Sequence, residues 1–348
     1  MNGFKRQAAI LIGILFLGSG LLKLMDPVGT MLIVTEWCRF FHVGFLVPLA
    51  KAMGIVLSIT EAGIGIGLIT GVFRKLMAIL TFAMMGFFTV VTLILWILNP
   101  VMDCGCFGEA IHLTHFQSFI KNIFILALAA FAFTPLKDLS RPANHKYVAA
   151  SIAFAGVILV AIYSASHLPV MEFTAFHPGT ELYAALDDDA SEEALQASAM
   201  LSFRNAEGEY LDSLAVEGPV VIFSVYKPAK ADWQRLRANC AEVLNLGARP
   251  LVLAASYPAE IEHLGVPADV PVYYSDYKTL ITLNRSNGGG TYFSRGELIY
   301  KWRAGELPEK LADELSEDPM AVCTRHMVNR RLTAQGYCVA LAAVLILL

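Results

Sequence analysis

Charged residues are scarce in this 348-residue sequence. They make up 16% of the chain, whereas hydrophobic residues make up 56%, and an ordinary soluble domain has about 25% charged residues. A purely water-soluble globule is therefore excluded, and the apolar excess also excludes an intrinsically disordered chain. The 26 glycines and 15 prolines follow no period, which excludes collagen and low-complexity arrays. The composition indicates a membrane protein.

Strong net charge is also absent. The formal net charge at pH 7 is -4, whereas proteins that bind nucleic acid usually carry a basic patch, so no nucleic-acid partner is expected. The charges are divided unevenly: residues 1–166 hold 11 Lys and Arg against 6 Asp and Glu, and residues 167–348 hold 15 against 24. We therefore expect a first half in lipid and a second half in water with a core of its own.

Five stretches are long and apolar enough to cross a bilayer. A helix that rises 1.5 Å per residue needs about 20 apolar residues to span about 30 Å of hydrocarbon. The predicted spans are residues 8–25, 46–72, 76–98, 117–136 and 147–166. The first lacks a small-x-small cleavage site, so we interpret it as a span and not as a signal peptide. Residues 336–348 are short for a span and predict an interfacial anchor, a thin sixth helix or the start of a longer helix.

Lysine and arginine in the short loops predict the orientation in the membrane. The loops before the first span, between the second and third spans and between the fourth and fifth spans hold Lys5, Arg6, Arg74, Lys75, Lys137, Arg141 and Lys146. By the positive-inside rule, these loops face the cytoplasm. Residues 26–45 and 99–116 then face outward, and the fifth span carries the second half of the chain to the outer side. We predict a multi-pass protein of the bacterial inner membrane with its acidic domain in the periplasm.

Two cysteines one residue apart follow the third span. The string DCGCFG at residues 103–108 places Cys104 and Cys106 in an outward loop, on the side of the membrane where disulfides form. A disulfide within C-x-C closes a small strained ring, and strain makes such a bond a labile oxidant. Redox chemistry is therefore the preferred role of the pair, with a metal site and an inert or structural role as alternatives.

The metal alternative depends on His112 and His115, which follow the pair closely. The spacing of the cysteines does not match that of zinc sites, so this hypothesis is minor. Cys38 lies in the other outward loop, in an apolar segment around Trp37 that predicts a helix in the membrane interface. Cys38 is a candidate relay partner of the cysteine pair, and a lone buried structural cysteine is at least as well supported.

Charged residues inside predicted spans are costly and usually mark function or a stabilising pair. Glu61 lies near the middle of the second span, beside small residues that let another helix approach closely. Lys23 and Lys121 lie near the outer ends of the first and fourth spans and are candidate counter-ions, although each can extend to the interface. A pair between Glu61 and a lysine is one hypothesis, and a structural and a proton-handling role for Glu61 both stay open.

Four features together resemble the DoxX/MauE-type four-helix membrane proteins. They are GSGLLKLMDP at residues 18–27, Glu61 with its glycine-rich stretch, DCGCFG at residues 103–108, and the Lys121-Asn122 dipeptide. The resemblance covers about residues 6–136, and DCGCFG is its most specific element. It implies a redox-associated bundle connected with disulfide maturation of an extracytoplasmic partner, with Cys104 and Cys106 as the matching residues. The fifth span and the appended domain depart from MauE and resemble long DoxX forms of the Bacteroidetes.

The second half predicts an α/β domain after an acidic lead-in that holds a strand or two. The predicted strands are residues 220–226, 251–255, 272–274, 291–293 and 298–302, and the predicted helices are residues 229–246, a short one near 260, 279–283 and one from Pro308. This order, βαβα then ββα, resembles a thioredoxin fold.

The residues that make a thioredoxin reactive are missing from this domain. PAKA at residues 228–231 stands where C-x-x-C would be, and residues 286–290 before the hairpin contain no proline. Cys240 falls on the predicted buried face of a helix, so a core position is favoured over catalysis. We predict that the domain docks a client or another redox protein. Cys323, between the domain and the tail, could reach the Cys104/Cys106 loop if the domain folds back.

The predicted architecture is an α-helical transmembrane bundle followed by an extracytoplasmic α/β thioredoxin-like domain and a short apolar helix. Its parts are a four-helix domain (1–136), a loop with the fifth span (137–166), the lead-in (167–218), the thioredoxin-like domain (219–320) and the tail helix (321–348).

The preferred function is thiol–disulfide or electron transfer at the extracytoplasmic membrane surface. Cys104, Cys106 and Cys38 are the candidate catalytic residues, and the bilayer location suggests a quinone as electron acceptor. No other cofactor and no metal is expected, and the expected partners are the lipid bilayer and an extracytoplasmic protein. A non-catalytic scaffold with structural cysteines is the alternative. A carrier that uses Glu61 and Lys23 is less favoured, because inverted repeats are not evident.

Overall fold

The computed structural model describes residues 3–135, 142–182, 192–306 and 311–347, and the chain divides into two compact units. Unit 1 comprises residues 1–171 and 333–348, and unit 2 comprises residues 172–332. Lys137 and Arg141 of the predicted cytoplasmic loop, and Pro308 at the start of the last predicted helix, lie outside the described residues.

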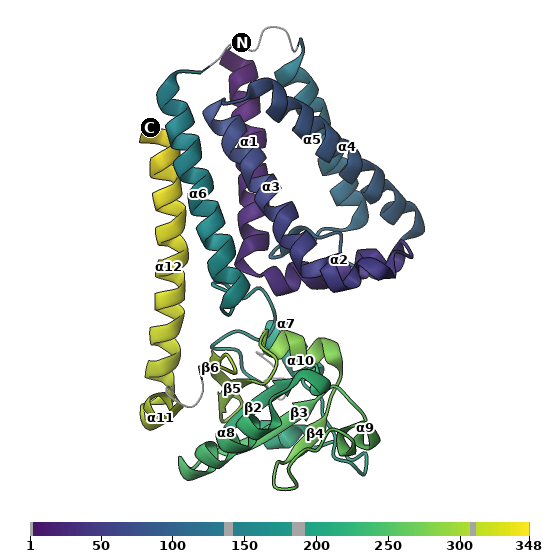
Figure 1. The fold of residues 1–348 in the computed structure, drawn as a ribbon, viewed down its shortest axis with the longest axis vertical. Coiled ribbons are helices and arrows are strands. Elements are labelled where there is room, and N and C mark those ends of the chain that lie inside the picture. The colour runs from purple at the N-terminus through teal and green to yellow at the C-terminus, as the bar shows by residue number, and fades with distance from the viewer. Residues whose placement is uncertain (1–2, 136–141, 183–191, 307–310, 348) are drawn as a thin grey trace. The chain divides into compact units, whose positions relative to one another are not determined.

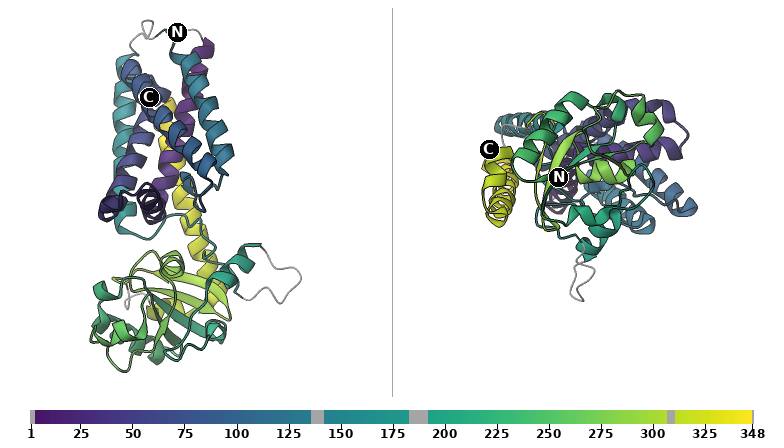
Figure 2. Two further views of the ribbon diagram at one scale, coloured as in Figure 1. Left: turned by 90° about the vertical axis from the view of Figure 1, so that its right-hand side faces the viewer. Right: turned by 90° about the horizontal axis from the view of Figure 1, so that it is seen from below.

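Unit 1 is a bundle of long apolar helices (Figure 1 and Figure 2). In the described part of the chain, five helical segments are long and apolar enough to cross a membrane. They are α1 (Gly3–Met25), the 3-10 helix η1 (Gly44–Leu49) continued by α3 (Ala50–Thr70), α4 (Arg74–Leu98), α5 (His115–Phe133) and α6 (Asn144–Ser166). Each overlaps one predicted span. The chain is therefore a multi-pass membrane protein.

The segment between the first two spans is also helical. α2 (Pro27–Phe40) runs across one end of the bundle, at a steep angle to α1 and α3 (Figure 1). The Asp26 carboxylate caps it by accepting a hydrogen bond from the backbone N–H of Gly29 at 2.9 Å, which satisfies one donor that the first turn leaves free. The helix that the apolar segment around Trp37 predicts is therefore present.

α1 and α3 pack closely because glycine lines their contact. A Cβ on Gly20 would lie 2.6 Å from the carbonyl oxygen of Ser58, and a Cβ on Gly65 would lie 2.5 Å from the backbone nitrogen of Leu17. A larger residue at either position would force the helices apart, as expected where small residues form a membrane helix contact. The short separation brings the side chains of α3 directly against α1.

The apolar stretch at the C-terminus belongs to a long helix. α12 (Pro319–Leu347) has 29 residues, so the predicted short apolar helix is the last part of a longer element. Within unit 1, Leu341 and Leu345 join the apolar cluster that α3 and α6 form. Polar residues such as Arg330 and Arg331 precede this stretch, and they interrupt the apolar pattern without ending the helix.

Unit 2 is built on a mixed five-stranded sheet in the order β4-β3-β2-β5-β6. The strands are β2 (Pro219–Val225), β3 (Arg249–Ala254), β4 (Val272–Tyr274), β5 (Gly289–Ser294) and β6 (Glu297–Trp302). β2, β3 and β4 run parallel, whereas β5 is antiparallel to both β2 and β6. Each strand overlaps a predicted one, and the domain is α/β, as predicted.

Both faces of the sheet are covered, which explains why β2 is a continuous apolar run. On one face, Phe223 of β2 packs with Trp233 and Cys240 of α8 (Trp233–Asn245). On the other face, Ile222 packs with Leu283 of α10. The remaining helices of this unit's described part are α7 (Glu192–Met200), η4 (Asp212–Ala215), η5 (Pro228–Lys230), α9 (Pro258–Glu262), α10 (Tyr277–Leu283) and α11 (Leu311–Ser316).

The acidic lead-in forms part of this domain. Phe176, Leu201 and Phe203 are at most 2% exposed and pack beside β2 on the face opposite α8. The strand or two predicted here is wrong for the described residues, which form α7, η4 and isolated β-bridges. The sequence of α7, EEALQASAM, is rich in residues with high helix propensity, and packing against the sheet orders the rest.

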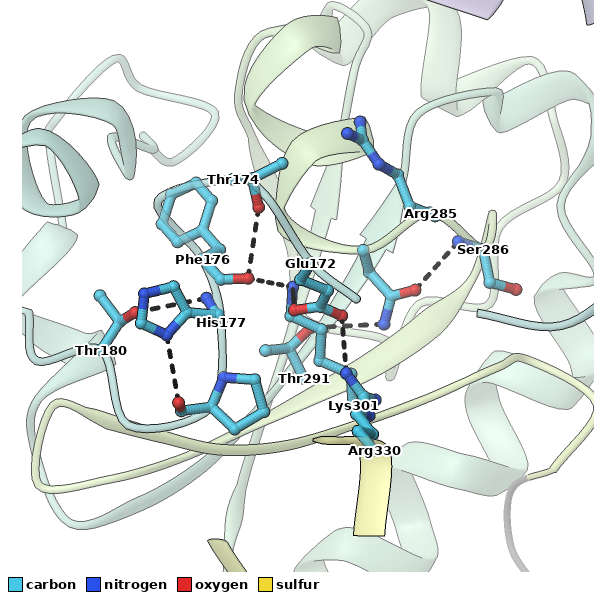
Figure 3. A network of polar contacts seen from close by, with 12 residues as sticks. Glu172, Thr174, Phe176, His177, Thr180, Arg285, Ser286, Thr291, Lys301 and Arg330 are labelled. Atoms are coloured by element: carbon cyan, nitrogen blue, oxygen red, sulfur yellow. Dashed lines mark hydrogen bonds and ion pairs between the residues drawn. The ribbon is translucent and has the colours of Figure 1, made fainter. Parts of the chain in front are cut away.

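A buried ion cluster joins the start of the lead-in to β6 and α12 (Figure 3). Nζ of Lys301 lies 2.8 Å from Oε2 of Glu172, and Nη1 of Arg330 lies 3.2 Å from Oε1. The Lys301 and Glu172 side chains are only 3% and 6% exposed. Burial lowers the pKa of Lys301. Burial opposes ionisation of Glu172, but the charges of Lys301 and Arg330 hold the pKa of Glu172 below its ordinary value.

We expect Lys301→Met to destabilise unit 2 by about 3 kcal/mol, because it removes the nearer of the two cations that compensate the buried Glu172 carboxylate and leaves only Arg330. Replacing both partners, as Glu172→Leu with Lys301→Met, should recover much of this loss. Because the folded pKa of Glu172 is lowered, its stabilisation should be present above the unfolded pKa of about 4.3 and be lost as the pH falls through the folded value. The measurement is the free energy of unfolding of the full chain in denaturant.

Arg249→Met is the matched control. Arg249 pairs with Glu217 at 2.8 Å, but these side chains are 44% and 51% exposed, so the loss should stay below about 1 kcal/mol. Equal losses for Lys301→Met and Arg249→Met would show that the buried cluster does not stabilise unit 2.

Candidate functional site

The loop between α4 and α5 carries both cysteines of the C-x-C pair and contains the short strand β1 (Cys106–Glu109). Gly105, between the cysteines, has φ of 69°, and a Cβ at this position would clash with Cγ2 of Ile33 on α2. Only glycine adopts this conformation readily and leaves this space free. Gly105 therefore lets the loop turn tightly against α2 and keeps the two thiols beside the helices.

A cavity of about 80 Å³ lies inside unit 1, beside this loop. Its lining is mostly apolar, with Phe16, Phe88 and Phe107 among the residues that form it. The polar or ionisable side chains in the lining are Ser19, Lys23, Thr30, Trp37, Glu61, Thr92, Cys104, Cys106, Lys121 and Asn122. Five of the six predicted site residues are thus brought together around one cavity.

The sixth, Cys38, is not one of the lining residues. Its side chain lies on α2 and is 4% exposed. The preceding residue, Trp37, lines the cavity, but Cys38 does not. The cavity does not bring Cys38 to the cysteine pair, and its relay role stays a prediction.

Lys23 of α1 and Glu61 of α3 form a buried ion pair. Nζ of Lys23 lies 2.7 Å from Oε2 and 2.8 Å from Oε1 of Glu61, and both side chains are 4% exposed. The Ser19 hydroxyl lies 2.8 Å from Oε2 of Glu61 and 2.7 Å from the carbonyl oxygen of Cys106. Ser19 therefore connects the ion pair to the loop between α4 and α5 that holds Cys104 and Cys106, here called the cysteine loop. The sequence does not single out Ser19, because a lone hydroxyl in an apolar helix gives no distinct signal.

Lys121, the other candidate counter-ion, lies at the cysteine pair. Its Nζ is 4.7 Å from the centre of the Phe107 ring, a cation–π distance, and its positive charge is among the causes that lower the pKa of Cys106. The sequence shows no cation directly beside Cys104 or Cys106. The folded chain supplies one from the first turns of α5.

The two thiols of the pair have different environments. Cys104 is 3% exposed and its Sγ lies 2.9 Å from Oγ of Ser118. The hydrogen bond between the two sulfurs raises the pKa of Cys104, and burial raises it further. The same hydrogen bond lowers the pKa of Cys106, and the positive charges of Lys121 and then Lys23 lower it further against the effect of burial. Cys106 is therefore the thiol that ionises first.

The metal alternative needs at least three ligands close together. In the ranges that the structure describes, no three His, Cys, Asp or Glu side chains are grouped so as to hold a metal ion. Nδ1 of His112 lies 3.2 Å from Oδ1 of Asp103, and Nε2 of His115 lies 3.0 Å from the carbonyl oxygen of Pro100. These contacts of the two histidines are with groups other than the cysteine sulfurs.

Both cysteines of unit 2 lie in its apolar core. Cys240 is 4% exposed in the core cluster that α8 and the sheet form, and burial raises its pKa to about 12. Cys323 is 2% exposed in the same cluster, and burial also raises its pKa. Cys240 therefore occupies the core position that its helix face predicts. Cys323 is enclosed in this core and is not presented to another cysteine.

The residues that line the cavity lie in a part of the chain that is similar to a known protein family. Residues 1–135 match the family described as methylamine utilisation protein MauE. A protein of Flavobacterium psychrophilum described as protein TlpB is 29% identical over 152 residues, which are 43% of this chain and 41% of that relative. The chain thus matches less than half of the length of this curated relative. No solved structure matches.

The family match confirms the predicted resemblance to MauE. The predicted resemblance to DoxX stays a prediction. Every residue that lines the cavity falls within residues 1–135. The cysteine loop and the Lys23–Glu61 pair therefore both belong to the segment that is similar to the MauE family.

Proposed function

We propose that this protein is a membrane thiol–disulfide redox component in which Cys104 and Cys106 alternate between a dithiol and a disulfide. The observation that supports this most directly is the cavity in which the pair lies beside Lys121 and Lys23. Thiolates, and not thiols, carry out disulfide exchange. The low pKa of Cys106 at a membrane surface is the property that such a reaction requires.

The exchange with a partner protein balances in two steps. In the oxidising direction, a partner thiolate attacks the Cys104–Cys106 disulfide and forms a mixed disulfide, releasing one cysteine of the pair as a thiolate. The second partner thiol then displaces the remaining cysteine. The partner gains a disulfide, and two electrons remain on Cys104 and Cys106. The stabilised thiolate of Cys106 makes it the better leaving group of the two.

The proposed site faces the periplasm, and the proposed partner is an extracytoplasmic protein. The loops rich in lysine and arginine support this orientation, and disulfides form on that side of the inner membrane. The similarity of residues 1–135 to the MauE family supports a role in the maturation of such a partner.

Unit 2 is proposed to be a thioredoxin-like domain that docks this partner without reacting. The parallel β2–β3 pair beside the antiparallel β5–β6 hairpin supports this interpretation. The segment after β2, where a thioredoxin holds C-x-x-C, contains η5 and no cysteine. The buried positions of Cys240 and Cys323 further support a binding role.

Thiol trapping tests the redox proposal. In intact cells, a membrane-impermeant maleimide should label Cys106, the less buried thiol of the pair, after a reductant and fail to label it after an oxidant, because the pair converts between dithiol and disulfide. Replacing both, as Cys104→Ala with Cys106→Ala, should abolish the oxidant-dependent gel shift. Cys338→Ala, at an exposed cysteine of α12, should leave it unchanged. A pair that stays reduced under every oxidant would show that the proposal is wrong.

The pH dependence of alkylation tests the role of Lys121. Because its pKa is lowered, Cys106 should react with iodoacetamide at pH values well below the ordinary cysteine pKa of about 8.5, and the rate should fall as the pH drops through the lowered value. Lys121→Gln removes a stabilising charge, so the rate at pH 6 should decrease by about tenfold.

Lys75→Gln, at an exposed lysine near the start of α4, is the matched control and should keep the wild-type profile. Mass spectrometry of the peptide that contains Cys106 gives the rate at each pH. Identical profiles for Lys121→Gln and the wild type would exclude Lys121 as the activating charge.

A further inference from the structure

One residue that lines the cavity beside the cysteine pair carries a buried hydrogen-bond donor that has no acceptor among the described residues. Nε1 of Trp37 is buried, and none of the described residues accepts its proton. Trp37 lines the cavity and packs in the same apolar cluster as Cys104 and Cys106. Buried donors in proteins are nearly always paired, because losing water without gaining a partner is costly. A ligand with an acceptor atom in this cavity would satisfy the indole.

The size and walls of the cavity favour a small flat ring. A water-sized group needs about 10–15 Å³, so a volume of about 80 Å³ holds about five to eight such groups. This corresponds to one six-membered ring with its two carbonyl oxygens, so the other ring substituents and the tail of a quinone would lie outside this volume. The rings of Phe16, Phe88 and Phe107 form part of the walls, and apolar walls with a few polar groups are typical of small-molecule sites.

The charges around the cavity favour oxygen acceptors on that ring. The ammonium groups of Lys23 and Lys121 both belong to lining residues. Lys23 is already neutralised by Glu61 at 2.7 Å, so the site has no need of a fully charged anion. A neutral molecule with carbonyl oxygens suits one indole donor, the paired ammonium of Lys23 and the ammonium of Lys121.

The proposed dithiol chemistry also requires a two-electron acceptor at this place. Both sulfurs belong to residues that line the cavity, and the surrounding helices are long and apolar enough to lie in hydrocarbon. An acceptor that dissolves in the bilayer can therefore reach the cysteine pair without crossing water.

We propose that this cavity binds a quinone headgroup, with one carbonyl oxygen accepting the Trp37 indole N–H, and that the quinone reoxidises the Cys104–Cys106 dithiol. This inference rests on the proposed function. The dithiol loses two electrons and two protons and forms the S–S bond. The quinone gains both electrons and two protons, which form the two O–H bonds of the hydroquinone. Trp37 is the binding residue and Cys104 and Cys106 are the reacting residues.

Binding of decylubiquinone to the full chain in lipid nanodiscs tests this proposal. Trp37→Phe keeps an aromatic ring but removes the N–H, so the Kd should increase about five- to tenfold, the loss expected for one hydrogen bond. Trp96→Phe is the matched control: Trp96 packs on Phe116 and Phe119 outside the cavity lining, and its replacement should leave the Kd unchanged. Thermal unfolding shows whether each variant is folded.

A cavity-filling variant provides an independent check. Val34 lines the cavity from α2, and Val34→Phe places additional volume in the same space, so it should abolish decylubiquinone binding. Binding that persists in this variant, or equal Kd values for Trp37→Phe and Trp96→Phe, would overturn the proposed quinone site.

Anaerobic mixing distinguishes this inference from the proposed function. The reduced protein should convert decylubiquinone to one hydroquinone per chain and form the Cys104–Cys106 disulfide, whereas Cys104→Ala with Cys106→Ala should bind the quinone without reducing it. If no quinone binds while the pair still exchanges with a protein disulfide, the inference is wrong and the proposed function stands. If quinone binds through Trp37 but the pair never forms a disulfide, the proposed function is wrong and the reoxidation step fails with it.

Discussion

The close contact between α1 and α3 is the constraint on which the cysteine cavity depends. At Gly20 and Gly65 the two backbones approach to a distance that no larger residue permits. Glu61 can therefore meet Lys23 within hydrogen-bond distance. A buried ion pair is tolerated only if its geometry is good and its remaining groups are satisfied, and Ser19 supplies the additional contact. Because Ser19 also reaches the loop of Cys106, helix packing and thiol position are coupled.

The exclusion of water that makes a charge costly inside the bundle also strengthens its effect on neighbouring groups. Ammonium groups act on a nearby thiol more strongly where water is excluded. Lys121 and Lys23 come from two different helices, and both lower the pKa of Cys106. Cys104 is held in the opposite state by the same sulfur–sulfur hydrogen bond and by burial. The pair is thus asymmetric, with one thiol that ionises readily and one that does not.

The cysteines of unit 2 differ from the Cys104–Cys106 pair in their surroundings. Cys240 and Cys323 fill positions in an apolar core, where burial raises their pKa. They pack as small hydrophobic side chains. The lead-in packs in a second apolar cluster on the other face of the sheet, and the Glu172–Lys301 ion pair is buried at its start. Among Cys104, Cys106, Cys240 and Cys323, Cys106 is therefore the thiol whose pKa is lowered, whereas the pKa values of the other three are raised.

The sequence by itself determined the spans and the strands, because a helix that crosses hydrocarbon needs a long apolar run and a buried strand needs a short one. It also identified Cys104 and Cys106 by their spacing and Glu61 by its depth in an apolar segment. Only the tertiary structure decided that Glu61 pairs with Lys23 while Lys121 contacts Cys106, that Cys38 stays outside the cavity, and that the lead-in packs on the sheet. Such pairings depend on which helix faces meet and at what depth, and residues far apart in the chain carry no periodic signal of that contact.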